Sequence, residues 1–232
     1  MYIFAMDTSS VTATVAVITE EKLLGEYSVS NRLTHSQTIL PMADELLKNL
    51  ELELKDIDVF SVCTGPGSFT GLRIGMATVK TMAQALSKPI IGVSSLDALG
   101  LSFYTADDTV VCPIVDARRQ EVYNALYSCG SKICDDRALN IDTLLCELRG
   151  KKVVFCGDAA ILHKDKIEGT SGENWKIAPQ HLILPKASSA AYAALKRAEE
   201  SSFDDPCTLN PVYLRKSQAE RELEERINGG NK

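Results

Sequence analysis

Two short turns carry residue types that hold phosphate groups in nucleotide-binding proteins. Asp7-Thr8-Ser9 follows the first apolar run, and Asp116-Ala-Arg-Arg follows a later one. A carboxylate can hold a magnesium ion while hydroxyls and backbone amides receive phosphate oxygens. The first turn is equally consistent with a turn made of good turn formers, and the second favours an arginine–carboxylate corner. The candidate nucleotide-binding residues are therefore Asp7, Thr8, Ser9 and Asp116, with ATP or ADP as the ligand of a cleft or of an interface in a complex.

A glycine-rich stretch joins an apolar strand to a long helix. Gly65, Gly67 and Gly71 allow close backbone approach, and Ser68 can cap the amides at the start of the helix. Such an element either receives an anion or packs very tightly. Its spacing departs from the G-x-x-x-x-G-K-[ST] pattern of P-loops. We interpret the three glycines as a structural turn that aims helix 72–86, with anion binding at the helix start as the alternative.

Other kinds of catalytic or metal site find little support. The three histidines lie in unrelated segments without H-x-x-x-H or H-E-x-x-H spacing, and no nucleophile–base arrangement can be assigned. Cys129 and Cys134 form a C-x4-C pair, but no second pair or clustered histidine completes a zinc site. The sequence therefore predicts no nucleophile, no catalytic base and no metal site.

The composition indicates an ordinary globular protein. The chain has 232 residues, of which 45% are hydrophobic and 24% charged, and its seven cysteines are odd in number. Several cysteines lie in apolar runs, so we expect reduced thiols in a cytoplasmic protein without a signal peptide or membrane span. The net charge of −6 argues against autonomous binding to a phosphate backbone. If nucleic acid is involved, a partner must supply most of the positive surface.

The periodicity of apolar residues predicts a mixed α/β fold. In the first half we expect strands at 2–6, 12–18, 22–29, 59–63 and 90–93, and helices at 35–50, 72–86 and 95–101. Pro41 either lies in the first turn of its helix or kinks it. The order β-β-β-α-β-α-β-α combines an antiparallel meander with helix-crossed parallel strands. It is the ribonuclease H-like, actin-like ATPase order found in sugar kinases, actin and the large chaperones.

The second half shows a weak repeat of this order. We expect strands at 110–115, 121–127 and 152–156, helices at 141–148 and 188–199, a loop region from Gly157 onward, and an exposed, flexible segment at 170–174. The predicted division is an N-terminal actin-like subdomain at 1–103, a similar C-terminal subdomain at 104–215, each with a mixed sheet, and a charged tail at 216–232.

Helix 72–86 carries two apolar faces, whereas a surface helix needs only one. The second face contains Ile74, Thr78, Met82 and Ala85. It is covered either by the rest of the fold or by another subunit.

Six ordered segments across nearly the whole chain make a family resemblance specific. They are Met-Asp-Thr-Ser-Ser, Thr-His-Ser-Gln-x-Ile-Leu-Pro, Gly-Pro-Gly-Ser-Phe-Thr-Gly-Leu-Arg-Ile-Gly, Pro-Ile-Ile-Gly-Val-Ser-Ser-Leu-Asp, Asp-Ala-Arg-Arg-Gln-Glu-Val-Tyr and Pro-Val-Tyr-Leu-Arg. In these segments the chain resembles the TsaB family. Its members are non-catalytic, TsaD-like subunits of the bacterial complex that makes threonylcarbamoyladenosine in tRNA.

The resemblance implies an accessory subunit required for threonylcarbamoyl transfer to the adenosine beside the anticodon in tRNAs that read codons starting with A. Such a subunit pairs with the catalytic paralogue TsaD, recruits the ATPase TsaE, touches tRNA only through the complex and can form a homodimer when alone. The pairing helices correspond to 35–50 and 72–86. The implied interface residues are Ile39, Leu40, Leu47, Ile74, Thr78, Met82 and Ala85.

The resemblance also bears on catalysis. The positions of a metal-binding H-x-x-x-H pair in TsaD correspond to Ser95 and Leu99. Serine is a weak metal ligand, and leucine cannot bind a metal. This implies a non-catalytic subunit and disfavours a peptidase. The alternative is an independent ATP-dependent small-molecule kinase of the same fold, with Asp7 and Asp116 around the phosphates. Binding to a TsaD-like subunit, as against kinase turnover by the isolated chain, separates the two hypotheses.

Overall fold

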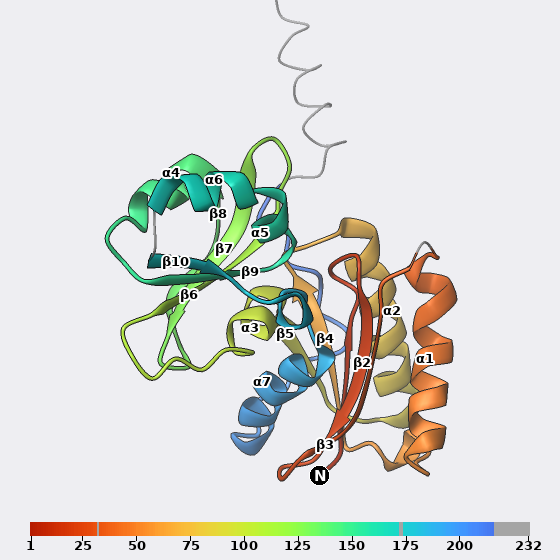
Figure 1. The fold of residues 1–232 in the computed structure, drawn as a ribbon. Helices are drawn as coiled ribbons and strands as arrows, with labels where there is room; N and C mark the ends of the chain where they lie inside the picture. The colour runs from red at the N-terminus through yellow and green to blue at the C-terminus, as the bar shows by residue number, and fades with distance from the viewer. Residues whose placement is uncertain (32, 172–173, 216–232) are drawn as a thin grey trace, which may run out of the picture.

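The computed structural model describes residues 1–31, 33–171 and 174–215, and the predicted charged tail at 216–232 lies outside them. Two five-stranded mixed sheets form the centre of the molecule (Figure 1). The first has the order β3-β2-β1-β4-β5 and contains β1 (Ile3–Asp7), β2 (Ala13–Ile18), β3 (Leu23–Val29), β4 (Val59–Gly65) and β5 (Ile90–Ser94). The second has the order β10-β9-β6-β7-β8 and contains β6 (Val110–Asp116), β7 (Glu121–Ser128), β8 (Ser131–Asn140), β9 (Val153–Cys156) and β10 (Trp175–Ile177).

The two sheets repeat one connectivity. In the first, β1 pairs antiparallel with β2 and parallel with β4. In the second, β6 pairs antiparallel with β7 and parallel with β9. The predicted meander followed by parallel strands is thereby confirmed, and β1 and β6 occupy equivalent central positions. Their carboxyl ends place Asp7 and Asp116 at equivalent edges, because the strands that flank each one are arranged alike.

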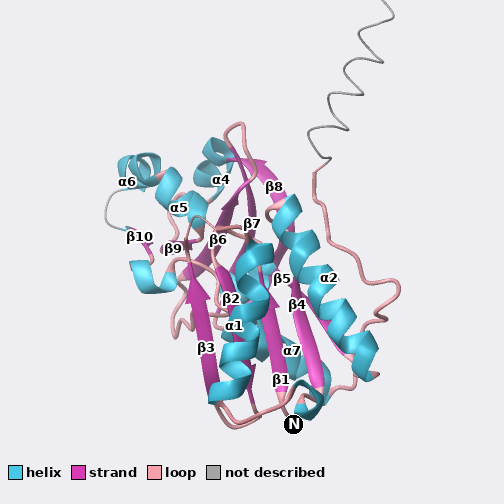
Figure 2. Ribbon diagram, turned by 90° about the vertical axis from the view of Figure 1, so that its right-hand side faces the viewer, coloured by secondary structure: helices cyan, strands magenta, loops and turns pink. Residues whose placement is uncertain are grey.

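Helices cover both faces of the first sheet. Helices α1 (His35–Asn49) and α2 (Phe69–Leu86) lie side by side on one face (Figure 2). On the other face, α7 (Ala187–Glu199) packs together with α3 (Ser95–Gly100). The sequence assigns α7 to the C-terminal subdomain, yet its alanines pack against the first sheet. Its small side chains let the helix approach β1 and β2 closely.

The second sheet carries shorter helices. They are α4 (Ile141–Glu147), α5 (Asp158–Leu162), α6 (Lys164–Ser171) and the 3-10 turn Gln180–Leu182. In the first half of the chain, another 3-10 turn, Leu54–Asp56, precedes β4. The loop predicted from Gly157 onward is wrong, because α5 begins directly after that glycine. Of the predicted flexible segment at 170–174, residues 172 and 173 lie outside the described part of the chain.

Three further differences concern α1, α2 and two edge strands. Pro41 lies well inside α1 rather than in its first turn. Helix α2 begins at Phe69, three residues before the predicted start, and the predicted cap is confirmed because Ser68 Oγ accepts a hydrogen bond from Gly71 N at 3.3 Å. Strands β8 and β10 were not predicted.

No helix in the described ranges is both long and apolar enough to cross a membrane.

Candidate functional site: a cleft between two hairpins and the α1–α2 surface

The first turn is buried beneath the start of α2. Asp7 is 1% exposed, and its Oδ1 accepts a hydrogen bond from Ser9 N at 2.7 Å. Thr8 Oγ1 donates to Gly71 O at 2.7 Å, and Ser68 N donates to Ser9 O at 2.7 Å. The Thr8 hydroxyl and the Ser9 amide, which a phosphate site would present as donors, are therefore already engaged, the first by α2 and the second within the turn.

Glycine is required where α2 crosses this turn. A Cβ atom at Gly67 would overlap Ser9 O, and one at Gly71 would overlap Thr8 O. Gly75, one turn further along α2, would overlap Thr8 Oγ1 in the same way. This direct contact between backbones is what the interpretation as a structural turn requires.

Burial also controls the charge of Asp7. Removal from water raises the pKa of its carboxyl group. Hydrogen bonds from Ser9 and from the Cys63 thiol oppose this rise, as does the charge of His35. The Cys63 thiol is itself fully buried beside the carboxyl group, and its pKa lies well above the usual range. The Asp7 carboxyl group, which is buried and accepts a hydrogen bond from Ser9 N, is therefore poorly placed to hold magnesium.

The second turn is open to solvent. Asp116 Oδ1 accepts a hydrogen bond from Arg118 N at 2.8 Å, and its Oδ2 lies 3.3 Å from Arg118 Nη1. The Arg118 side chain is 85% exposed. Arg118, Arg119 and Gln120 all have left-handed backbone conformations, with φ of 65°, 55° and 61°. The contacts within this turn are those of the arginine–carboxylate corner that the sequence favours.

A cleft of about 610 Å³ lies between the two turns. Its walls come from the starts of α1 and α2 on one side and from the β6–β7 hairpin on the other; among its lining residues are Ser9, Ser10, His35, Ser68, Thr70, Ile74, Asp116, Arg118, Asp158 and Arg215. Of the four predicted nucleotide-binding residues, Ser9 and Asp116 line the cleft, whereas Asp7 and Thr8 do not. The Thr8 side chain points toward α2, whereas the Asp7 carboxyl group is buried beside the Cys63 thiol.

Asp158 is a cleft residue that the sequence did not single out. Its Oδ1 accepts a hydrogen bond from Asp116 N at 3.1 Å. Burial raises its pKa, and the nearby Asp116 carboxylate adds to the rise. An aspartate that directly follows a glycine at a helix start was the available signal. The prediction of a loop after Gly157 concealed it.

Ser95 and Leu99, the positions that correspond to the metal-binding H-x-x-x-H pair of TsaD, are both buried. Ser95 begins α3 and is fully buried beside the Cys63 thiol. Leu99 belongs to the apolar core on the second sheet. Across the residues that the structure describes, no three histidine, cysteine, aspartate or glutamate side chains gather as a metal site.

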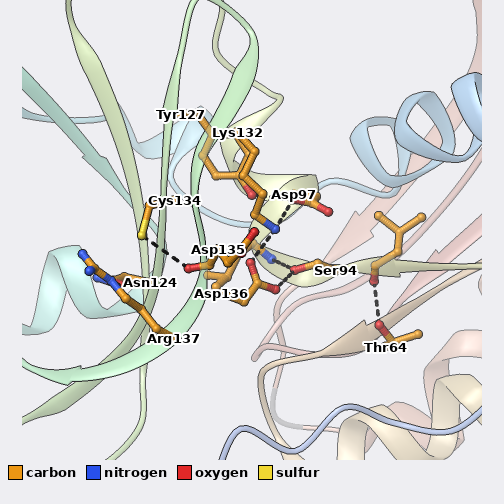
Figure 3. A network of polar contacts seen from close by, with 12 residues as sticks. Thr64, Ser94, Asp97, Asn124, Tyr127, Lys132, Cys134, Asp135, Asp136 and Arg137 are labelled. Carbon is orange, nitrogen blue, oxygen red and sulfur yellow. Dashed lines mark hydrogen bonds and ion pairs between the residues drawn. The ribbon is translucent and has the colours of Figure 1, made fainter.

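A polar network joins the two sheets beside α3 (Figure 3). Lys132 Nζ lies 2.8 Å from Asp97 and 2.6 Å from Asp136, and Ser94 Oγ donates to Asp136 at 2.5 Å. Tyr127 OH donates to Asp97 at 2.5 Å. Lys132 and Asp136 belong to β8, so this network could not be found without that strand.

The α1–α2 surface contains only part of the implied interface set. Ile39 and Leu47 are buried in the chain's own core, because they face the first sheet. Leu40 is 50% exposed, and Ala85 is exposed as well. The remaining members are half-buried at the edge of the same core: Ile74, Thr78 and Met82. We define the α1–α2 surface as Leu40, Ile74, Thr78, Met82 and Ala85. Ile39 and Leu47 are not part of it.

The paired mixed sheets with a cleft between them define the actin-like ATPase and sugar kinase fold class. An inorganic polyphosphate/ATP-glucomannokinase from Arthrobacter shares this fold with a TM-score of 0.53 at 11% identity, over 86% of this chain and 99% of that one. YeaZ from Pseudomonas aeruginosa has a TM-score of 0.78 and 25% identity, over 92% of this chain and 99% of that one.

The family follows from the sequence matches. The TsaD family, described as tRNA N6-adenosine threonylcarbamoyltransferase, matches residues 28–223. The Bacillus subtilis tRNA threonylcarbamoyladenosine biosynthesis protein TsaB is 32% identical over 226 residues, which cover 95% of this chain and 96% of that protein. The chain belongs to the TsaB family within the wider TsaD group, as its six motifs predict.

Proposed function

We propose that this chain serves in tRNA threonylcarbamoyladenosine biosynthesis as an accessory subunit that pairs with a TsaD-like catalytic subunit. The relatives named TsaB support the pathway, and the exposed α1–α2 surface is the observation that supports the role as a partner. The chain offers this surface, while Asp7 and Thr8 of the first turn are buried away from the cleft.

The α1–α2 surface has the composition of a docking face. Leu40 is half exposed on α1, and the exposed Ala85 leaves room for close approach to α2. Ile74 and Met82 extend the apolar character between them, at the edge of the core. Apolar groups at the centre of such a face gain free energy when a partner removes them from water.

The kinase alternative has weaker support. A kinase needs carboxylates positioned around the phosphates and a base beside the acceptor. Asp7 is sealed from the cleft, and Asp116 is engaged by Arg118 in the corner of its own turn. The cleft has room for a small polar ligand, and ATP or ADP bound there would be consistent with either role.

The finer assignments form part of the same proposal. In it, the paired subunits recruit a TsaE-like ATPase, and tRNA is touched through the complex. In isolation, the same α1–α2 surface pairs two copies of the chain, in competition with the catalytic subunit.

Calorimetric titration with the TsaD-like subunit tests the proposal. Leu40→Glu and Ala85→Glu should weaken binding by about tenfold or more, because each places a charge in the interface. Their melting temperatures should stay near that of the wild type, since both residues are exposed. Tyr192→Glu is the control, because Tyr192 is 49% exposed on α7, on the opposite side of the first sheet. Binding of all three variants with wild-type affinity would contradict the proposed interface.

A further inference from the structure

The Pro211-Val-Tyr-Leu-Arg215 motif has no role in the proposed docking face, yet it connects the two sheets. The segment after α7 runs along the outside of α2 toward the second sheet (Figure 2). It is attached first at the edge of β5, where Asp204 N donates to Ile90 O at 2.9 Å and Gly92 N donates to Asp204 Oδ2 at 2.7 Å. Further along, Lys80 Nζ donates to Leu209 O at 2.8 Å.

The first half of the motif is fixed to the end of β4 and the start of α2. Val212 N donates to Thr64 O at 2.8 Å, and a Cβ atom at Gly65 would lie 2.8 Å from Val212 O. The Tyr213 ring stacks on Phe69 with centroids 4.5 Å apart and an angle of 9° between the planes. Arg73 Nε donates to Tyr213 OH at 3.0 Å, so the ring is held at two points.

The next two residues, Leu214 and Arg215, contact the second sheet. Leu214 packs against the apolar core of that sheet. Arg215 Nη1 donates to Ala117 O at 2.6 Å and forms an ion pair with Glu121. The Arg215 side chain is only 17% exposed, so its hydrogen bonds are shielded from water. Within three consecutive residues, the chain passes from α2 to the β6–β7 hairpin.

We propose that Pro211–Arg215 is a strap that holds the β6–β7 hairpin to α2 and so couples the α1–α2 surface to the cleft. Arg215 and Phe69 both line the cleft, one on each side of this link. A partner that fixes α2 therefore restrains the hairpin that forms the opposite wall, through Tyr213 and Arg215. A ligand that moves the hairpin changes α2 by the same route. The coupling rests on the proposed function, whereas the strap itself can be tested in the isolated chain.

Amide hydrogen exchange measured by NMR on the isolated chain tests the strap. In the hairpin, Ala117 N donates to Glu121 O at 3.0 Å and Glu121 N donates to Arg118 O at 3.1 Å. Arg215→Met keeps the aliphatic stem and removes the guanidinium, so both amides should exchange at least about tenfold faster. Amides of β1 should exchange at the wild-type rate. Arg149→Met, at an exposed arginine after α4, is the matched control and should change neither set.

Two outcomes of the Arg215→Met experiment would overturn the strap. One is wild-type exchange of the hairpin amides in Arg215→Met. The other is an equal increase throughout β1, which would mean general loss of stability. If Arg215→Met does not fold, Arg215→Lys decides, because lysine keeps the charge opposite Glu121 without the geometry of the guanidinium. Wild-type exchange of the hairpin in that variant would overturn the strap as well.

A second arm tests the coupling, with the TsaD-like subunit added. Its binding should slow exchange of the hairpin amides in the wild type and leave them fast in Arg215→Met. Equal slowing in both proteins would place the coupling outside the strap. Failure of the subunit to bind the wild type would refute the proposed function, and the first arm would still decide whether the strap exists.

Discussion

The β1–β2 and β6–β7 hairpins occupy equivalent places in two sheets of the same connectivity, yet they differ in almost every contact. The first is covered by the start of α2, where Gly71 and, just before the helix, Gly67 lie directly on its backbone. The second presents an exposed Arg118 at its tip, and three non-glycine residues form its left-handed turn. The shared connectivity therefore does not give the two hairpins a shared site. The first hairpin supports the start of α2, and the second forms a wall of the cleft.

This difference locates the function of the first hairpin. Its polar groups fix the position of α2, and α2 presents Ile74, Thr78, Met82 and Ala85. What resembles a phosphate-binding turn in sequence thus positions the helix that carries the proposed docking face. Substitutions at the two hairpins should have unequal consequences.

The largest expected effect is at Gly71. Gly71→Ala should lower the free energy of unfolding by about 3 kcal/mol, because the added Cβ overlaps the carbonyl oxygen of Thr8 and α2 must shift. Urea denaturation measures the change. The matched control is Gly169→Ala in α6, where no atom lies within 4 Å of the added Cβ. That variant should be as stable as the wild type or more stable. Equal losses in the two variants would show that α2 is not tightly packed on the first hairpin.

A smaller effect is expected from the buried carboxyl group of Asp7. Its pKa is raised in the folded protein, so the folded state binds a proton more tightly than the unfolded state does. Its contribution to the free energy of unfolding therefore falls as pH rises from the unfolded pKa through the folded pKa, and stays low above it.

Asp7→Asn should remove this loss. The difference in free energy of unfolding between variant and wild type should grow with pH across that window, toward about 1 kcal/mol in favour of the variant. Denaturation at a series of pH values gives the difference directly, since the other titrating groups are shared. A difference that stays constant with pH would mean that Asp7 is ionised as readily in the folded protein as in the unfolded one.

The fold of the first sheet could be predicted from sequence because its strands are nearly all apolar and its helices have clear periodicity. Strand β8 could not, because its sequence, Ser-Lys-Ile-Cys-Asp-Asp-Arg-Ala-Leu-Asn, has the composition of a loop. Its charged residues are satisfied by distant partners. Lys132 pairs with Asp97, and Arg137 pairs with Glu147. Local sequence carries no record of such contacts.

The location of the candidate site could be predicted from the sequence, but the exposure of its side chains could not. The positions of Asp7 and Asp116 at strand ends followed from the strand pattern. The burial of Asp7 beside the Cys63 thiol of β4 is a tertiary contact, and the local sequence around Asp7 does not show it. Spacing on α1 likewise could not show which apolar residues face the sheet, and Ile39 and Leu47 prove to be core residues.

The central claim is that this chain contributes a surface rather than catalytic groups. Threonylcarbamoyladenosine formation, reconstituted with the TsaD-like subunit, the ATPase, the activated donor and tRNA, tests it most directly. Ala85→Glu should lower the rate by about tenfold or more, and Asp116→Asn should stay within about twofold of the wild type. Loss of the reaction with Asp116→Asn, together with a wild-type rate for Ala85→Glu, would contradict the account.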